Sequence, residues 1–106
     1  RINAENHESF FPSSGDVTNY HVPGGPGIRI DSGLYNGLKI TNYYDGLIAK
    51  LIIHGKNREE CLLRLNRALH EFVIDGIDTT IPLYQKIIKE KKFLSANYDI
   101  NWLESL

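Results

Sequence analysis

Few residues of this chain have the type and spacing that chemistry at a site requires. The glycine-rich run at residues 23–27 lacks the Gly-Lys-Ser/Thr of a phosphate-binding loop and precedes no helix, so it is interpreted as a turn. Cys61 has no general base beside it in the sequence and is expected to face the core as a small apolar residue. No metal site is predicted, because the four histidines lack the spacing of metal ligands. These histidines are His7, His21, His54 and His70.

Two further features are open to more than one interpretation. In Tyr43-Tyr44-Asp45, aromatic hydroxyls stand beside a carboxylate just before an apolar stretch, and such a group would suit the lining of a cleft. The same residues fit a strand edge equally well, with Asp45 capping the segment that follows. Arg1 alternates with apolar neighbours, and an arginine in a strand is usually exposed and without a chemical role. The residues alone leave both questions open.

The first half of the chain predicts short strands joined by turns. It holds most of the Gly and Pro residues, and its segments alternate apolar with polar residues, which is the strand period. Residues 47–54 form the most apolar stretch, which is expected to end in a buried strand, although residues 45–49 also fit a helix. Strands are predicted over residues 1–5, 28–31 and 50–54, and more weakly over residues 16–22 and 37–40.

The second half predicts two helices, of which the first is the clearer. Asn57 is a good N-cap, and Glu60 stands three residues later, as in a capping box. Apolar residues then recur at helical spacing as far as Val73. Gly76 is expected to end this helix at the C′ position, where glycine is common.

The second helix is expected to begin at Thr80, with Pro82 in the first turn, where a missing N–H costs least. Three lysines suit its C-terminal end: Lys89, Lys91 and Lys92. Residues 100–106 are interpreted as a short amphipathic tail that carries Trp102. Strands followed by helices predict an α+β fold, in which short antiparallel strands of the N-terminal half pack against a C-terminal helical hairpin.

Length and composition limit the class of protein. The chain has 106 residues, 42% of them apolar, which is enough for one domain over residues 1–106 with a single core. A net charge of −1 argues against nucleic-acid binding, and no apolar run approaches the roughly 18 residues of a membrane span. One cysteine fits a reducing cytoplasm. Because the chain lacks Met and begins with Arg1, it is expected to be a piece of a longer protein.

Six ordered segments together resemble the C-terminal domain of biotin carboxylase. They span nearly the whole chain in the family's order, so the chain is identified as a member of this family. The segments are Arg-Ile-Asn-Ala-Glu at 1–5, Phe-Pro-Ser-Ser-Gly at 11–15, Pro-Gly-Gly-Pro-Gly-Ile-Arg at 23–29, Tyr-Tyr-Asp-Gly-Leu-Ile-Ala-Lys-Leu at 43–51, Asn-Arg-Glu-Glu at 57–60, and 68–80, which ends in Gly-Ile-Asp-Thr-Thr.

The resemblance implies a fragment of an ATP-grasp ligase. Such enzymes use ATP, Mg²⁺ and bicarbonate to carboxylate biotin on a carrier protein, the first step of acetyl-CoA carboxylase in fatty acid synthesis. The nucleotide, metal and bicarbonate sites lie mostly in two preceding domains, so no cofactor is expected in this chain alone and the isolated chain is expected to be inactive. The implied partners are those domains, the biotin carboxyl carrier protein, a carboxyltransferase and a second copy in a homodimer.

The resemblance also assigns roles residue by residue. Arg1 matches a catalytic arginine that contacts biotin and the reacting centre, where its permanently charged, planar group would face the negative charge that builds on the ureido oxygen. Tyr44 and Asp45 match a motif on the biotin and bicarbonate side, with Asp45 expected to orient Arg1. Lys50 belongs to the same motif and is given a structural role. Arg29 matches an arginine at the dimer interface.

Small departures from the family pattern leave the parent enzyme open. They fall in loops and change turn rigidity by roughly 0.5–1 kcal/mol each. They are Asn6-His7 in place of Asp-Pro, Ser14 in place of Pro, Thr41-Asn42 in place of a Pro pair, and Gly46 in place of Ser. The alternatives are the same domain from propionyl-CoA, methylcrotonyl-CoA or pyruvate carboxylase, and a non-catalytic binding module of this fold.

Overall fold

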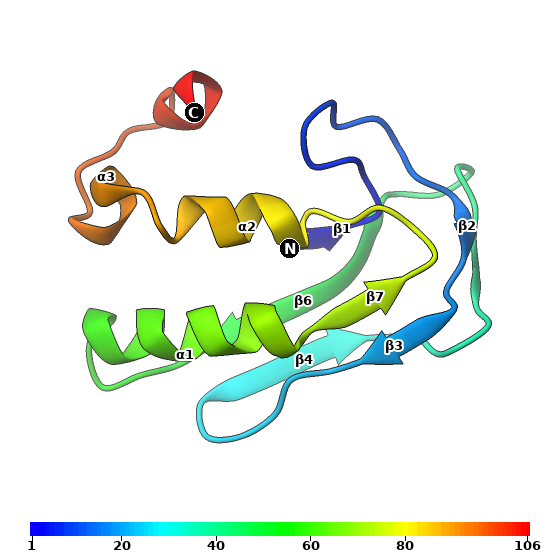
Figure 1. Cartoon of the computed structure of the whole chain (residues 1–106), viewed down its shortest axis with the longest axis horizontal. Coiled ribbons are helices and arrows are strands. Elements are labelled where there is room, and N and C mark those ends of the chain that lie inside the picture. Colours follow the sequence, from blue (N-terminus) through cyan, green and yellow to red (C-terminus); the bar gives the residue numbers. More distant parts are fainter.

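A computed structural model describes all residues from 1 to 106 (Figure 1). Its main sheet has three antiparallel strands in the order β1-β6-β4, formed by β1 (Ile2–Asn3), β6 (Leu47–Ile53) and β4 (Ile28–Ser32). In this sheet Ile2 lies opposite Ala49, and Ile30 lies opposite Leu51. The long central strand β6 therefore joins the N-terminal residues to the segment that follows the glycine-rich turn.

Two small antiparallel sheets extend the structure beyond the main one. In the first, β2 (Gly15–Asp16) pairs with β5 (Lys39–Ile40). In the second, β3 (Asn19–His21) pairs with β7 (Val73–Asp75), which lies beyond the first long helix in the sequence. The short antiparallel strands and the helices that follow confirm the predicted α+β class.

Four helical segments follow in the second half of the chain. The longest is α1 (Arg58–Glu71), and α2 (Ile81–Ile87) runs beside it. The shorter α3 (Lys91–Leu94) and a 3₁₀ helix, η1 (Trp102–Ser105), complete the chain. None of these helices has the length and hydropathy that crossing a membrane requires.

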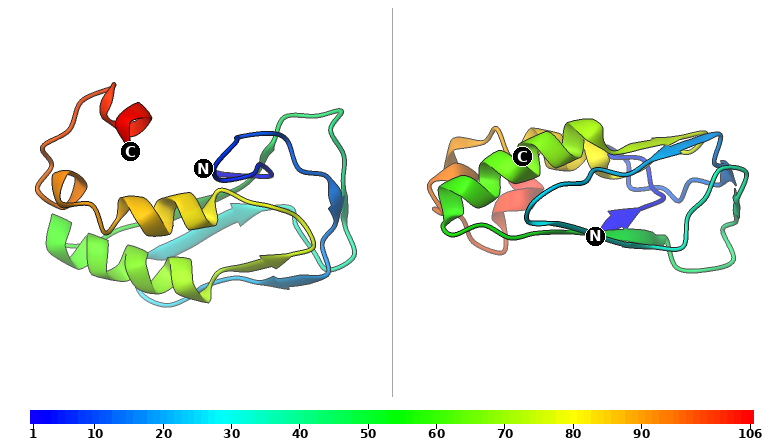
Figure 2. Two further views of the ribbon diagram at one scale, coloured as in Figure 1. Left: turned by 45° about the horizontal axis from the view of Figure 1, so that its top comes forward. Right: turned by 90° about the horizontal axis from the view of Figure 1, so that it is seen from below.

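The helices and the main sheet form two layers. Figure 2 shows α1 and α2 together on one side of the molecule, with β1 and β6 on the other. The core between the layers contains Ile2 and Ala49 from the sheet and Leu69 from α1. The opposite face of the sheet carries Arg29, Asp31 and Lys50, all exposed. We call this surface the open face.

The predicted end of the first helix was wrong. The helix begins as expected, with the Asn57 side chain accepting a hydrogen bond from the Glu60 N–H at 2.9 Å. It ends at Glu71, however, and residues 73–75 form β7 instead of a last helical turn. The reason is tertiary, because Val73 and its neighbours pair with β3, more than fifty residues earlier in the chain. Gly76 is therefore not a helix cap.

Gly76 instead allows a close approach between two backbone segments. It has φ +99, and a Cβ at this position would lie 1.9 Å from the backbone oxygen of Asp16. Only glycine combines this positive φ with such contact at little steric cost.

Three smaller boundaries also differ from the prediction. Residues 45–49 have no helical character, because β6 runs from Leu47 to Ile53. The weak strand over residues 16–22 is divided into β2 and β3. The second helix ends at Ile87, so the three lysines predicted at its end lie beyond it, two of them in α3.

Candidate functional site

The backbone of Arg1 is fixed by the start of α2 as well as by β6. The N–H of Asn3 donates to the Thr80 Oγ1 at 3.0 Å, and the Thr80 N–H donates to the Asn3 carbonyl at 3.1 Å. The Tyr84 hydroxyl donates to the carbonyl of Arg1. Thr80 was predicted to cap α2, and it occupies that position, but its side chain makes no capping hydrogen bond and binds β1 instead. The residue that begins α2 thereby anchors the strand next to Arg1.

The side chain of Arg1 is exposed and forms no ion pair with any carboxylate of the chain. Because Ile2 lies opposite Ala49, the antiparallel register places Arg1 opposite Lys50 of β6. Lys50 in turn lies opposite Asp31 of β4. Arg1, Lys50 and Asp31 thus form one row across the main sheet, on its open face.

In the isolated 106-residue chain, the α-amino group of Arg1 responds to the same charges. Its pKa is lowered from the ordinary value, first because burial removes water from it, and then because the Arg1 guanidinium and the Lys50 ammonium repel its charge. The effect of Lys50 on this group agrees with the register, which brings the two residues together. Positive charge is therefore concentrated at this end of the open face.

Arg29 lies on the same face, two residues from Asp31 along β4. Its Nε and Nη2 donate to the two carboxylate oxygens of Asp31, each at 3.0 Å. Both side chains are largely exposed, with 73% and 45% of their surface accessible. The hydrogen bonds to Asp31 raise the pKa of Arg29 above its ordinary value. Asp31 is the only carboxylate in this group, and each of its oxygens accepts a hydrogen bond from Arg29.

Tyr44 and Asp45 lie at the other end of β1. The Ala4 N–H bonds to the Gly46 carbonyl, so Asp45 is separated from Arg1 by on the order of 13 Å along the strand direction. Asp45 accepts a hydrogen bond from the Leu47 N–H at 3.4 Å, as expected of a residue that precedes a strand, and forms no ion pair with Arg1. Tyr44 is 84% exposed. The structure therefore brings Arg1 together with Lys50 but not with Tyr44 or Asp45.

The glycine-rich turn before β4 lies against two arginines of α1, one bound to the turn and one to the neighbouring His54, and the sequence did not reveal either contact. Arg67 Nη1 donates to the carbonyl of Gly24 at 3.1 Å, and Arg64 Nη1 donates to the carbonyl of His54 at 2.7 Å. Gly27 has φ +71, and a Cβ there would lie 2.2 Å from the same His54 oxygen. The turn is thus packed against α1, and this fixes where β4 and Arg29 begin.

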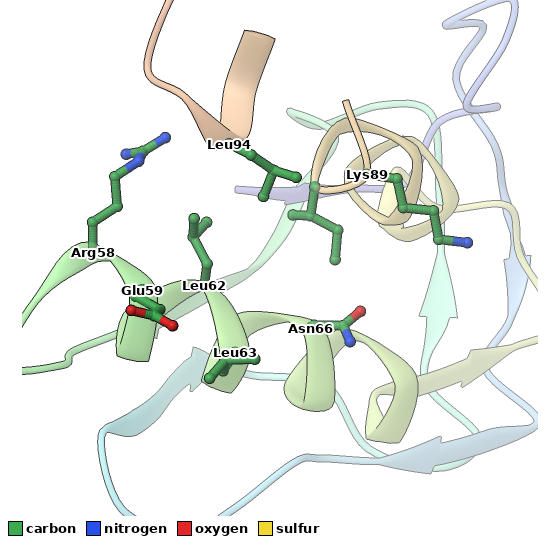
Figure 3. Close-up of a pocket in the computed structure, with 8 residues that line it drawn as sticks. Arg58, Glu59, Leu62, Leu63, Asn66, Lys89 and Leu94 are labelled. Atoms are coloured by element: carbon green, nitrogen blue, oxygen red, sulfur yellow. The ribbon is translucent and has the colours of Figure 1, made fainter. Parts of the chain in front are cut away.

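Two cavities are lined in part by residues of the helical layer. A groove of about 640 Å³ runs between α1 and the segment from Ile88 to Leu94, and Figure 3 shows Leu62 and Leu94 pointing into it from opposite sides. A second, almost wholly apolar cavity of about 270 Å³ lies next to Arg1, between Leu51 of the sheet and Tyr84 of α2. Neither contains a pair of groups arranged for acid–base or nucleophilic chemistry.

The remaining candidates for chemistry stay separate in the structure. The Sγ atom of Cys61 lies 3.6 Å from the carbonyl of Ile53, half-buried under the start of α1. His70 is bound to the Asn66 carbonyl of its own helix, and His7 lies beside Glu8 in a loop. No group of three or more His, Cys, Asp or Glu side chains is placed to hold a metal ion. These residues therefore do not fit a Mg²⁺ site.

Comparison with known proteins shows the family to which the chain belongs. A family model described as the biotin carboxylase C-terminal domain matches residues 1–105. "Biotin carboxylase 1" of Bacillus subtilis is 48% identical over 106 residues, covering 99% of this chain and 24% of that protein. A pyruvate carboxylase subunit from Methanothermobacter thermautotrophicus is 46% identical over 94 residues, covering 88% of this chain and 19% of that protein.

A solved structure has nearly the same fold as this chain. It is the biotin carboxylase domain dimer of the 2-oxoglutarate carboxylase from Hydrogenobacter thermophilus, determined with MgADP, ADP and bicarbonate. Its TM-score is 0.96 at 43% identity, and the match covers 99% of this chain and 23% of that one. The chain spans about a quarter of the length of the proteins it matches. It belongs to the biotin carboxylase C-terminal domain family.

Proposed function

We propose that this chain is the part of an ATP-dependent biotin carboxylase that supplies a catalytic arginine, Arg1, to a site completed by ATP-grasp domains outside the 106 residues. The observation that carries the proposal is that Arg1 has an anchored backbone and an unpaired side chain. Its backbone is held by Thr80 and Tyr84, while its guanidinium is exposed and has no carboxylate partner. An anchored cation without an anion is suited to act on a group that arrives from elsewhere.

The chemistry of biotin explains why an arginine suits this position. The ureido group of biotin supplies the nitrogen that accepts the carboxyl group, and its oxygen gains negative charge when that nitrogen loses its proton. The guanidinium of Arg1 stays charged at every working pH and presents a planar set of N–H donors to such an oxygen. A preorganised donor facing developing charge typically contributes about 3–4 kcal/mol in a site from which water is excluded.

Tyr44 and Asp45 are proposed to contact the reactants from the biotin and bicarbonate side. Both are exposed, and Tyr44 also lines a small cavity of about 80 Å³ beside Glu5. Since Asp45 makes no contact with Arg1, it would act on the reactants directly and would not orient the arginine. ATP and Mg²⁺ are proposed to bind the domains that this chain lacks, and biotin to arrive on a carboxyl carrier protein.

The acyl acceptor is proposed to be acetyl-CoA, through a separate carboxyltransferase in fatty acid synthesis. The relatives include parts of a pyruvate carboxylase and a 2-oxoglutarate carboxylase. They therefore support the biotin carboxylase step, which they share, and do not select the final acceptor. The protein sequence that follows Leu106 discriminates between them. A short tail supports a biotin carboxylase made as its own polypeptide, whereas a continuing chain with a Met-Lys-Met biotin-accepting segment supports a fused carboxylase.

The complete enzyme is proposed to be a cytoplasmic homodimer with Arg29 at its interface. Arg29 lies on β4, an edge strand of the main sheet, and its exposed guanidinium is held in place by Asp31. The Hydrogenobacter thermophilus relative is described as a dimer, which supports such an assembly. The single free cysteine, Cys61, fits a reducing compartment.

Biotin-dependent ATP hydrolysis tests the proposal. In the complete enzyme that contains this chain, Arg1→Gln is expected to lower kcat by at least about 100-fold. Arg1→Lys is expected to recover only a small part, because an ammonium lacks the planar fork. Lys39→Gln, which removes an exposed charge on a different sheet, serves as the control and should leave kcat within about twofold of the parent.

Two outcomes would contradict the proposal. If Arg1→Gln retains parental kcat, Arg1 is not catalytic. If the complete protein shows no biotin-dependent ATP hydrolysis, the alternative of a non-catalytic module is favoured. The isolated 106-residue chain is expected to be inactive in the same assay, and activity there would show that the ATP site lies within it.

A further inference from the structure

Lys50 is placed beside Arg1 by the register of the main sheet. Residues opposite each other in antiparallel strands have Cβ atoms about 4.5–5.5 Å apart and point to the same face. Continued by one residue from the pair of Ile2 and Ala49, the register places Arg1 opposite Lys50. The sequence placed Lys50 in the same motif as Tyr44 and Asp45, on the active-site side, but assigned it no role in binding. In the structure Lys50 is exposed, and the register together with its electrostatic effect on the Arg1 backbone amine places it beside the proposed catalytic arginine.

The one carboxylate near Lys50 is already bound. Asp31 lies directly opposite Lys50 on β4, which is the usual geometry of a cross-strand ion pair. Both oxygens of Asp31 nevertheless accept from Arg29, at 3.0 Å each. Lys50 forms no ion pair with any residue of the chain. Asp31 thus pairs with Arg29 and forms no ion pair with Lys50.

Two unneutralised cations side by side are unfavourable unless an anion joins them. Like charges directly opposite each other in a sheet destabilise it, and here neither Arg1 nor Lys50 forms an ion pair with a carboxylate. On the other side of Lys50, Asp31 and Arg29 balance each other. The surplus charge of the open face is therefore concentrated at Arg1 and Lys50, and this is where an incoming anion would bind.

We propose that Lys50 is a second anion-binding residue of the Arg1 site and that the two cations together bind an oxyanion of the carbonate or phosphate type. The proposal rests on the proposed function and extends it from one residue to two. The two side chains suit different parts of the task. A planar guanidinium matches the flat face of a ureido or carbonate group, whereas an ammonium is a compact charge with three donors that can follow a reacting oxyanion.

Steady-state kinetics of the complete enzyme test the role of Lys50. Lys50→Gln is expected to raise KM for bicarbonate, or the inhibition constant of inorganic phosphate, by about tenfold or more, because a charge-assisted hydrogen bond is lost. KM for ATP should stay within about twofold. Lys50→Arg should recover most of the loss, since it keeps the charge. A change confined to bicarbonate assigns the carbonate oxyanion, and a change confined to phosphate assigns the phosphate oxyanion.

Lys39→Gln is the matched control, since Lys39 is another exposed strand lysine but lies on β5, outside the main sheet. The inference is overturned if Lys50→Gln leaves both anion constants within twofold of the parent. It is also overturned if the variant lowers only the melting temperature or the dimer mass, because Lys50 would then pair with a carboxylate of another domain. If Arg1→Gln loses activity while Lys50→Gln keeps the parental KM for bicarbonate and the parental inhibition constant of phosphate, this inference alone is refuted. The proposed function then still stands.

Discussion

Asp31 holds Arg29 through both of its carboxylate oxygens, one accepting from Nε and the other from Nη2 at 3.0 Å. The two residues stand on the same face of an edge strand, two positions apart, so the pair presents a fixed guanidinium to the surroundings of β4. A side chain restrained in this way loses less conformational freedom when it binds a partner. The same pairing withdraws Asp31 from Lys50, and this connects the proposed interface to the charge at Arg1.

Reversal of the Arg29 charge is expected to weaken dimerisation of the complete enzyme. Arg29→Glu should lower the mass measured by analytical ultracentrifugation towards that of a monomer. Asp31→Asn should produce a smaller shift in the same direction, because Arg29 would then lose its restraint. Lys39→Glu is the control for charge reversal at an exposed strand position. Equal masses for Arg29→Glu and the parent would remove Arg29 from the interface.

Loss of the Thr80 hydroxyl is expected to destabilise the fold. Thr80 is 3% exposed, and its Oγ1 accepts from the Asn3 N–H at 3.0 Å. Thr80→Val keeps the shape of the side chain but leaves that N–H without an acceptor, which costs about 1–3 kcal/mol. Urea denaturation of the 106-residue chain measures the change. Thr18→Val, at an exposed threonine with no side-chain hydrogen bond, should lower the free energy of unfolding far less. Equal losses in the two variants would contradict a stabilising role for the hydrogen bond between Asn3 and Thr80.

Alanine at position 76 is expected to be more harmful than alanine at another glycine with positive φ. Gly37 has φ +91 but open space around it, so Gly37→Ala should cost only the conformational term of about 1–2 kcal/mol. Gly76→Ala adds a clash with the Asp16 backbone oxygen and should cost at least about 1 kcal/mol more. Chemical denaturation of the two variants makes the comparison. Similar costs would mean that the contact between residues 16 and 76 relaxes easily.

The α-amino group of Arg1 predicts a pH dependence for the 106-residue chain. Its pKa is lowered in the folded state, whereas the unfolded chain has the ordinary value of about 8. The unfolded state therefore binds this proton more tightly, and the free energy of unfolding should fall as pH decreases from about 8 through the lowered pKa. Acetylation of the amine should remove this part of the pH dependence. An unchanged slope in the acetylated chain would assign it to another group.

The features that the sequence predicted well depend on local interactions. The start of α1 is predictable from Asn57 and Glu60 because a capping box involves only neighbouring residues. The end of α1 is not, since residues 73–75 follow an apolar helical pattern but gain more by pairing with β3. Gly76 resembles a helix cap for the same reason. Its real constraint, the Asp16 oxygen, belongs to a segment sixty residues earlier.

The residues of the site were likewise predictable only where a local motif identifies them. Arg1 is identifiable through its motif, and its importance stays a prediction that kinetics must test. Its neighbours are not accessible from the sequence, because the pairing of Arg1 with Lys50 depends on a register between strands that lie far apart in the chain. Thr80 and Tyr84 have the local pattern of a helix cap and an apolar face, and nothing in that pattern indicates that they bind β1.

The hydrogen bonds from Thr80 and Tyr84 to Arg1 have a consequence for folding during synthesis. The groups that hold the carbonyl of Arg1 come 79 and 83 positions later in the chain. A ribosome that has produced β1, and even its partner β6, has yet to make the residues that fix this arginine. Contacts over such sequence separations form late, after the intervening chain has emerged and closed. A nascent polypeptide that stalls before α2 would hold Arg1 only through the pairing of β1 with β6, without the hydrogen bonds from Thr80 and Tyr84.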